Sequence, residues 1–296
     1  MTLRATHPRP GRRGVLAAAV GALGGALGAA PAVATPAVTA PAAVPSARPV
    51  PVRVLTFNIH HGAGTDGVFD LDRVARVIEG TDADVVGLQE VDRFWGARSG
   101  WTDVAAELGR RLGMWHVFGA NLDLDPPAEG APRRRYGTAV LTPWPILSWR
   151  NTPLPKLAGH EQRGLLRAEI QVRGARLRFA GTHLQHDNSP ERQLQAASVR
   201  ELLGDDARRT VLAGDLNALP DAPETGVLTD FLTDAWGAAG EGDGFTYGSL
   251  DPHARIDYLM ASADVRVVRA AVVGLDPGAS DHLPVLADLL VGPGVH

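Results

Sequence analysis

The chain has 296 residues, of which 45% are hydrophobic and 21% charged, and it contains no cysteine. This balance is typical of a globular protein, and the lack of cysteine excludes disulfides, thiolate zinc sites and a cysteine nucleophile. The formal net charge is −4, and beyond residue 34 the chain holds 25 basic and 33 acidic residues. An acidic protein is poorly suited to tight, nonspecific binding of nucleic acid.

Residues 1–34 predict an export signal. Arg12 and Arg13 precede a run of Ala, Gly, Leu and Val over residues 14–30, and Ala32-Val33-Ala34 is a small-x-small cleavage pattern. The arginine pair resembles the signal of the twin-arginine route, so we expect a secreted protein. The alternative is a retained membrane anchor, for which this weakly apolar run is short. Residues 35–51 predict a Pro/Ala-rich linker, and residues 52–292 a single domain.

From residue 52 onward, apolar strand-like runs alternate with amphipathic helical segments. Helices are expected over 71–79, behind Asp70 as N-cap, over 102–112, and from Pro190 to about residue 203. Strands are expected over 52–59, 84–89, 137–141, 165–172, 177–182, 210–214, 255–261, 265–273 and 284–290. This order predicts an α/β fold in which two sheets pack together with helices outside.

Chemically competent side chains lie at the ends of these strands or inside them. They are Asn58, Glu90, His183, Asp215, Asn217, Asp257, Asp281 and His282. Each one alone has an ordinary explanation, such as a turn residue or a buried structural histidine. Together they predict that six strands bring acid, amide and imidazole groups to one rim of the sandwich.

Three of these residues predict a site for a hard cation. Glu90, Asn58 and Asp281 supply the oxygen ligands that Mg²⁺ prefers, and Mn²⁺ or Ca²⁺ would bind the same set. Such a cation neutralises a phosphoryl oxygen during hydrolysis of a phosphoester.

The remaining polar residues fit the other needs of that reaction. His282, paired with Asp257, would accept the proton of the attacking water near neutral pH. His183 and Asn217 would bind the phosphoryl oxygens as negative charge develops.

The ordered segments resemble the endonuclease/exonuclease/phosphatase superfamily, which includes DNase I-like nucleases, exonuclease III-like repair enzymes, inositol polyphosphate 5-phosphatases and neutral sphingomyelinases. The resemblance spans residues 52–290. It rests on Thr56-Phe57-Asn58, Leu88-Gln89-Glu90-Val91-Asp92, Gly181-Thr182-His183-Leu184, Gly214-Asp215-Leu216-Asn217, Arg255-Ile256-Asp257-Tyr258 and Ser280-Asp281-His282-Leu283-Pro284.

This resemblance implies a four-layer α/β sandwich and a role for each motif. Glu90 would be the principal metal ligand, with Asn58 and Asp281 nearby. Asp215 and Asn217 would position or activate water, His183 would bind the phosphoryl group, and His282, oriented by Asp257, would act as acid and base. Arg163, Tyr136 and His60 would contact the substrate.

One departure concerns His183. DNase-like members support the equivalent histidine with a carboxylate, whereas this chain has Arg133-Arg134-Arg135 before Tyr136 and no evident partner. The three arginines predict either an anion-binding loop or solvated surface charge.

The substrate remains open at this point, because members of one fold act on many substrates. The segment Asn58–Gly62 resembles a secreted bacterial branch of small metal-dependent hydrolases linked by similarity to membrane-lipid processing. We therefore expect a phosphoester substrate: a lipid headgroup or a small phosphodiester or phosphomonoester. An extracellular nuclease is the alternative, and a non-enzymatic binding module is a third reading.

The aromatic residues Phe94, Trp95 and Trp101 follow Glu90 closely. They predict either a substrate rim with peripheral membrane contact or a cap on the core. No obligate protein partner is expected.

Overall fold

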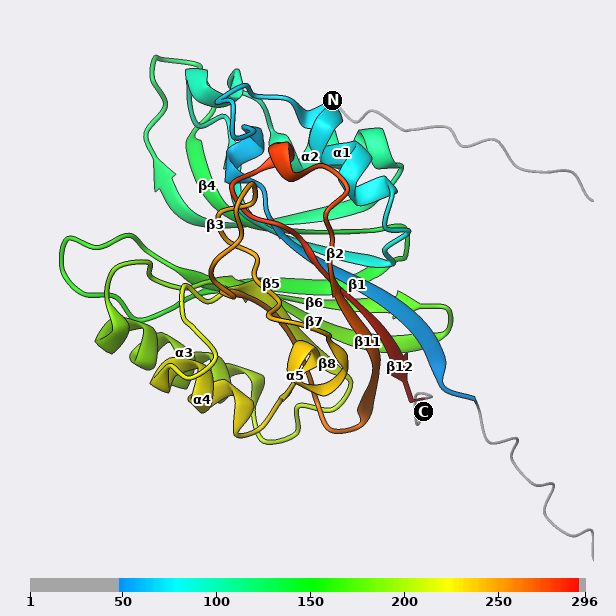
Figure 1. The fold of residues 1–296 in the computed structure, drawn as a ribbon. Helices are drawn as coiled ribbons and strands as arrows, with labels where there is room; N and C mark the ends of the chain where they lie inside the picture. Colours follow the sequence, from blue (N-terminus) through cyan, green and yellow to red (C-terminus); the bar gives the residue numbers. More distant parts are fainter. Residues whose placement is uncertain (1–47, 293–296) are drawn as a thin grey trace, which may run out of the picture. The chain divides into compact units, whose positions relative to one another are not determined.

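The computed structural model describes residues 48–292 (Figure 1). The predicted export signal and most of the predicted linker lie outside the described residues. The first strand, β1, begins at Val50, two residues before the predicted start of the domain. None of the helices in residues 48–292 is long and apolar enough to cross a membrane.

The first of two mixed sheets has six strands in the order β11-β12-β1-β2-β4-β3. Its members are β11 (Val265–Val272), β12 (Val285–Val291), β1 (Val50–Asn58), β2 (Val85–Arg93), β4 (Arg134–Thr142) and β3 (Trp115–Leu124). At its centre β1 and β2 run parallel, and the other neighbouring pairs are antiparallel.

The second sheet also has six strands, in the order β5-β6-β7-β8-β10-β9. Its members are β5 (Ile146–Pro153), β6 (Gly164–Val172), β7 (Ala175–His183), β8 (Thr210–Asp215), β10 (Asp257–Ala261) and β9 (Thr233–Asp234). The pattern repeats that of the first sheet: β7 and β8 form a central parallel pair, with antiparallel strands on both sides. In each sheet, the two central strands therefore end at the same edge.

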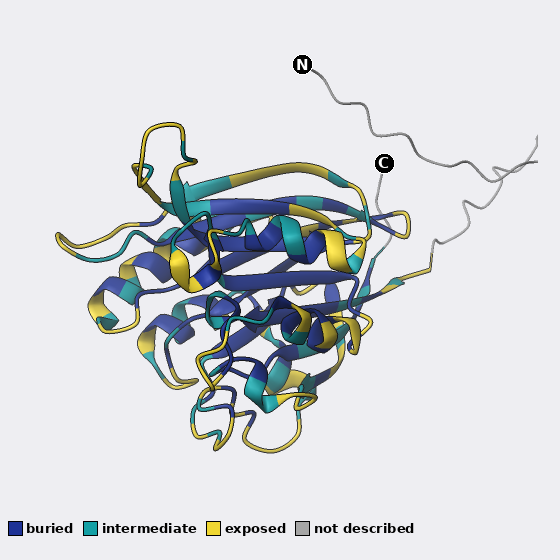
Figure 2. Cartoon of the chain, turned by 90° about the horizontal axis from the view of Figure 1, so that it is seen from above, coloured by how far each residue is buried: buried dark blue, intermediate teal, exposed yellow. Residues whose placement is uncertain are grey.

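Helices cover the outer faces of both sheets and confirm the predicted four-layer sandwich. The helices are α1 (Leu71–Glu79), α2 (Val104–Leu112), α3 (Ser189–Leu203), α4 (Pro223–Thr229) and α5 (Ala235–Ala239), with 3₁₀ turns at His60–Gly62, Ala97–Ser99 and Pro277–Ala279. In Figure 1, α1 and α2 lie above the first sheet, and α3 and α4 lie below the second. Figure 2 shows that burial concentrates in the central strands and exposure in loops and on the outer sides of helices.

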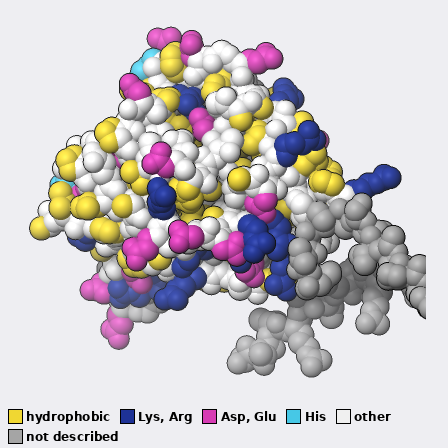
Figure 3. All heavy atoms as spheres, turned by 90° about the horizontal axis from the view of Figure 1, so that it is seen from below, with side chains coloured by type: hydrophobic (Ala, Val, Ile, Leu, Met, Phe, Trp, Pro, Cys, Tyr) yellow, Lys and Arg dark blue, Asp and Glu magenta, His cyan; other side chains and the backbone are white. Residues whose placement is uncertain are grey.

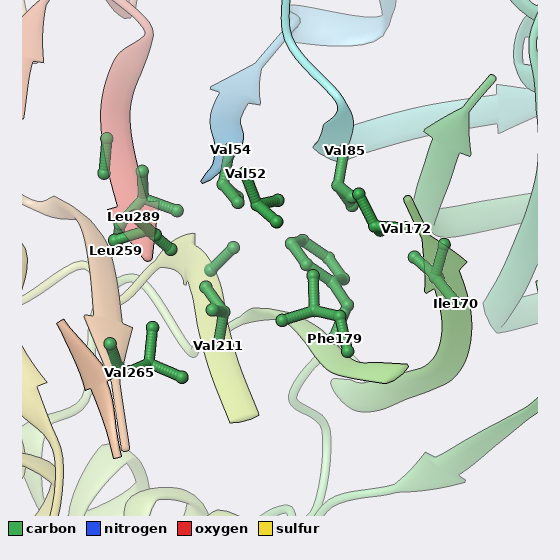
Figure 4. Packing of buried hydrophobic residues seen from close by; sticks show 14 of the residues in the cluster. Val52, Val54, Val85, Ile170, Val172, Phe179, Val211, Leu259, Val265 and Leu289 are labelled. Atoms are coloured by element: carbon green, nitrogen blue, oxygen red, sulfur yellow. The ribbon is translucent and has the colours of Figure 1, made fainter. Parts of the chain in front are cut away.

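Apolar side chains fill the space between all four layers. The central cluster joins the inner faces of the two sheets through residues such as Val54, Val85, Phe179 and Val211 (Figure 4). A second cluster packs α1 and α2 on the first sheet, and a third packs α3 and α4 on the second. These three apolar clusters hold the strands, and with them the polar residues at the strand ends, in fixed positions.

Most predicted elements are confirmed, and the first helix matches the predicted bounds. Asp70 caps it, because its Oδ1 accepts a hydrogen bond from Arg73 N at 3.0 Å. The prediction missed β3 and β5, together with the short elements α4, α5 and β9. The middle of β5 is largely exposed, so it lacks the apolar alternation that reveals a strand packed on one side.

The aromatic ring of Phe179 sits at the middle of the inter-sheet cluster and is 1% exposed. We expect Phe179→Ala to lower the free energy of unfolding by about 3–5 kcal/mol, because it removes a ring and leaves a cavity between the sheets. Leu147→Ala, at an exposed position of β5, is the control and should cost less than about 1 kcal/mol. Urea unfolding of both variants measures the difference, and equal costs would contradict the proposed core.

Candidate active site

The predicted polar residues meet where the central strands of the two sheets end. Asn58 closes β1, and Glu90 lies near the end of β2. His183 and Asp215 close β7 and β8 and are direct register partners. The parallel pairs therefore deliver side chains from both sheets to one rim, as the sequence predicted.

Asn58 joins the two sheets through its side-chain amide. Its Nδ2 donates to Glu90 Oε1 at 3.1 Å and to Asp215 Oδ2 at 3.0 Å, and it lies 3.4 Å from His282 Nε2. The backbone N–H of His60 donates to Asn58 Oδ1 at 3.1 Å, which fixes the orientation of the amide. Asn58 is fully buried, so these bonds are shielded from water.

Glu90 has a left-handed backbone, with φ of 58°. The pairing of β2 with β4 shifts register between Leu88 and Val91, so Glu90 occupies an irregular position in the ladder. Such irregularities redirect a side chain. Here the carboxylate of Glu90 points to the Asn58 amide.

His282 and Asp257 form a buried ion pair. His282 Nδ1 lies 2.8 Å from Asp257 Oδ2, and the two residues are 5% and 2% exposed. Burial alone would lower the pKa of His282, but the charge and hydrogen bond of Asp257, helped by Asp215, raise it to about 10. His282 is therefore protonated in this environment. The ring of Tyr247 packs 5.0 Å from it.

His183 is neutral, in contrast to the protonated His282. Burial, followed by the positive charges of Arg163 and His282, lowers the pKa of His183 well below its usual value. Its Nε2 lies 3.6 Å from Asp215 Oδ2, and within residues 48–292 this is the one carboxylate within 4.0 Å of the ring nitrogens. The histidine is therefore a neutral, hydrogen-bonding group.

Asp215 lies between the two imidazoles and accepts from the loop that follows it. Its Oδ1 accepts from Asn217 N at 2.8 Å, and its Oδ2 is 3.7 Å from His282 Nε2. Burial, followed by the nearby charge of Asp257, raises the pKa of Asp215 to about 7. The Asn217 side chain donates its Nδ2 to Leu184 O at 3.1 Å, which holds the β7 and β8 ends together.

Asp281 is held next to this centre by its backbone. Its carbonyl accepts hydrogen bonds from Gly248 N and Ser249 N, and the Ser280 hydroxyl contacts both Asn58 O and Asp281 Oδ1. The 244–254 segment is thereby tied to the strand end that carries Asn58.

Two sets of residues could hold a metal ion. Asp215, Asp257 and His282 offer ligand atoms within 4.8 Å of one another. The predicted set has only two acids, Glu90 and Asp281, and in the described part of the chain the Asn58 amide contacts Glu90 but not the Asp281 side chain. The predicted assignment therefore stays a prediction.

Arg163 and Tyr136, which were predicted to contact the substrate, lie beside Glu90. Glu161, an acid that the sequence interpretation missed, lies there too. Arg163 Nη1 pairs with Glu161 Oε1 at 2.9 Å. Burial, followed by the charges of Glu90 and Glu161, raises the pKa of Tyr136 well above its usual value. Glu161 lies outside any strand motif, so only the fold reveals it.

Arg98 was also missed. Asp92 holds it with two hydrogen bonds, at 2.7 and 2.9 Å, and its guanidinium lies 5.6 Å from the ring centres of both Trp95 and Tyr136. Trp101 is 44% exposed, whereas Trp95 is half-buried between Arg98 and Arg134. The aromatic cluster therefore includes both a packed ring and an exposed one.

The Arg133–Arg135 run is engaged by neighbours. Arg133 pairs with Asp123 and Asp125 at 2.6 and 2.8 Å, and Arg135 pairs with Asp123 at 3.2 Å. Arg134 donates to Trp95 O at 2.8 Å. The acids neutralise two of the three charges, so the anion-binding alternative loses its support and the run is mainly a paired surface.

Residues 55–282 match the Endonuclease/Exonuclease/phosphatase family. The chain belongs to this family. A family member from Beutenbergia cavernae has 30% identity and a TM-score of 0.71, over 83% of this chain and 72% of that one.

Two other solved structures share the fold. A mannosyl-6-phosphatase from Bacteroides thetaiotaomicron has 16% identity and a TM-score of 0.64, over 80% of this chain and 99% of that one. The human Nocturnin catalytic domain has 20% identity and a TM-score of 0.61, over 81% and 93%. The family members are hydrolases of phosphoesters, and the two distant structures support the fold alone.

The Asp257–His282 pair predicts a measurable protonation change. We expect Asp257→Asn to lower the pKa of His282 well below its present value of about 10, because the main opposing charge is lost while burial remains. Asp281→Asn should have a smaller effect, since Asp281 contributes less to this shift. NMR titration of the His282 ring measures both variants, and equal shifts would contradict the pairing.

Proposed function

We propose that the chain is an exported, divalent-metal-dependent phosphoesterase that hydrolyses lipid headgroups or other small phosphoesters. The observation that carries this proposal is the contact of Asn58 with both Glu90 and Asp215, next to the Asp257–His282 pair. It places oxygen ligands, an acid–imidazole pair and a second imidazole around one rim. The predicted N-terminal signal supports export.

A hard cation fits the chemistry of this rim. The carboxylates of half-buried Glu90 and buried Asp215 both accept a hydrogen bond from the amide nitrogen of Asn58. Asp257 is a third acid nearby, and it is buried. Asp257 Oδ1 is buried and has no hydrogen-bond partner within residues 48–292. Such a group of acids favours a bound cation, and oxygen ligands favour Mg²⁺, with Mn²⁺ or Ca²⁺ as alternatives.

We propose that Glu90 and Asp281 hold the cation, rather than the group of Asp215, Asp257 and His282. Asn58 would join them as an oxygen ligand only after its amide turned, because its Nδ2 faces Glu90 and its Oδ1 accepts from His60 N. In that second group His282 and Asp257 already bond to each other, and a protonated imidazole is a poor metal ligand. When bound, the cation would neutralise a phosphoryl oxygen and stabilise the leaving oxygen.

The chain's own residues would divide the proton and charge chemistry. The sequence predicted that His282 accepts the proton of the water, but His282 already carries a proton beside Asp257, so it would instead donate to a phosphoryl oxygen. Asp215, whose pKa is about 7, would accept the proton of the attacking water. Neutral His183 would hydrogen-bond the phosphoryl group, and Asn217 would keep Asp215 oriented.

Arg163 and Tyr136 would complete the phosphoryl pocket. Both are buried beside Glu90, so substrate charge would meet a desolvated guanidinium and hydroxyl. His60 would contribute in two ways, because its backbone N–H orients Asn58 and its side chain would contact the substrate as predicted.

A nuclease is the alternative function. The excess of acidic residues and the pairing of Arg133 and Arg135 with acids weaken the electrostatic hold on a phosphate backbone. A binding module without activity is disfavoured, because such a protein has no need for a buried acid–imidazole pair beside an acid-rich rim.

Glu90 and His282 test the reaction chemistry. We expect Glu90→Gln and His282→Ala each to lower metal-dependent hydrolysis at least about 100-fold, since each removes a charge that acts on the reacting phosphoryl group. Removing metal with EDTA should abolish turnover, and added Mg²⁺ should restore it. Rates with a soluble aryl phosphodiester and phosphomonoester measure these effects.

Glu201→Gln, at an exposed position of α3, is the matched control and should keep full activity. Circular dichroism should show that all variants remain folded. Full turnover by Glu90→Gln, or turnover that EDTA leaves unchanged, would reject the metal assignment.

The substrate class is tested by a parallel panel. Purified protein with Mg²⁺ is incubated with plasmid DNA, RNA, phosphatidylinositol and sphingomyelin. We expect release of lipid headgroups to be much faster than nicking of plasmid. Efficient nicking without headgroup release would favour the nuclease instead.

A further inference from the structure

The outer face of the second sheet carries a pocket of about 390 Å³ that the proposed reaction does not use. Strands β5, β6 and β7 and the last residues of α3 form its walls. Its lining includes Arg150, Arg167, Arg178, Glu169 and Trp149. Thr210, the first residue of β8, also lines it, whereas the candidate active site lies at the other end of that strand.

Two of the lining arginines lie directly opposite each other. Arg150 in β5 and Arg167 in β6 are register partners, so their side chains leave the sheet on the same face. Like charges in this arrangement repel each other. In residues 48–292, neither guanidinium has a carboxylate within the 4.0 Å ion-pair distance, and the ion pair within the lining joins Arg178 and Glu169 instead.

The surroundings of Arg167 make its charge costly. Its Nη1 donates to Leu202 O at 2.6 Å, but its Nε is buried and has no hydrogen-bond partner in the described segment. Burial, followed by the charge of Arg150, lowers the pKa of Arg167. Arg167 is half-buried, and its unpaired Nε–H would gain a hydrogen-bond partner from a nearby anion.

The third arginine of the lining, Arg178, is exposed to solvent. Arg178 is 51% exposed, and its contact with Glu169 is at the 4.0 Å limit of an ion pair. Three arginines and one glutamate leave the lining with two excess positive charges. Seen from below, the molecule shows basic and acidic side chains mixed on its surface (Figure 3).

We propose that this pocket binds the phosphate or sulfate group of a small soluble molecule. The forked donors of arginine match the oxygens of such groups. The volume lies in the range of small-molecule sites, and Leu202 and Leu203 offer apolar surface for the rest of the ligand. A lipid headgroup carries the same phosphate, and the experiment below separates the two sources.

The test follows the side-chain Nε–Hε signal of Arg178 by NMR while inorganic phosphate is added to the protein. Because Arg178 lines this pocket, its signal reports binding there even if phosphate also enters the candidate active site. The signal is assigned with Arg178→Lys. We expect a saturable shift below about 10 mM phosphate.

Arg150→Gln should weaken this binding about tenfold, because it removes one charged hydrogen-bond donor. Arg150 is exposed, so this variant should fold, and Arg167→Gln is a second variant with the same expected loss. Arg176→Gln is the matched control: Arg176 lies two residues before Arg178 on the same face of β7, outside the pocket. Binding should be unchanged in it.

Three results would overturn the proposal. The first is an Arg178 signal that phosphate does not shift. The second is an equal loss in Arg176→Gln, which would indicate diffuse surface charge. The third is binding to phosphatidic acid vesicles that Arg150→Gln abolishes while soluble phosphate has no effect, which would assign the pocket to a membrane headgroup.

Discussion

The side-chain amide of Asn58 connects both sheets at the rim. Its nitrogen donates to Glu90 from the first sheet and to Asp215 from the second. An uncharged amide group can donate a hydrogen bond to each of two carboxylates and so hold them close together. The relative position of the two sheets therefore determines the site, and the apolar cluster between them, which includes Phe179, determines that position.

The same rim holds two histidines in different charge states. His282 bonds to Asp257 and carries a proton, whereas His183 lies near Arg163 and is neutral. Both are buried to the same degree, so desolvation alone cannot separate them. The neighbouring charge sets the difference, and one rim gains both a charged donor and a neutral hydrogen-bonding group.

The sequence predicted the layers and the principal site residues because both depend on short local patterns. Buried strands such as β8 are continuous apolar runs, and a polar residue at the end, such as Asp215, is conspicuous there. The exposed strand β5 has no such pattern, and it was missed. Glu161 and Arg98 were missed because neither belongs to a local motif. Contacts between segments that are distant in the sequence bring them beside Glu90 and Tyr136. The pairing of Arg133 with Asp123 likewise required the β3–β4 register.

The left-handed backbone at Glu90 has a consequence for the evolution of this fold. A non-glycine residue in that conformation costs about 1–2 kcal/mol, and glycine would adopt it freely. Mutation under pressure for stability alone would therefore drift toward glycine at this position. If Glu90 binds the cation as proposed, its carboxylate accounts for the strain, and a variant chain that no longer needs the cation would gain stability from glycine at residue 90.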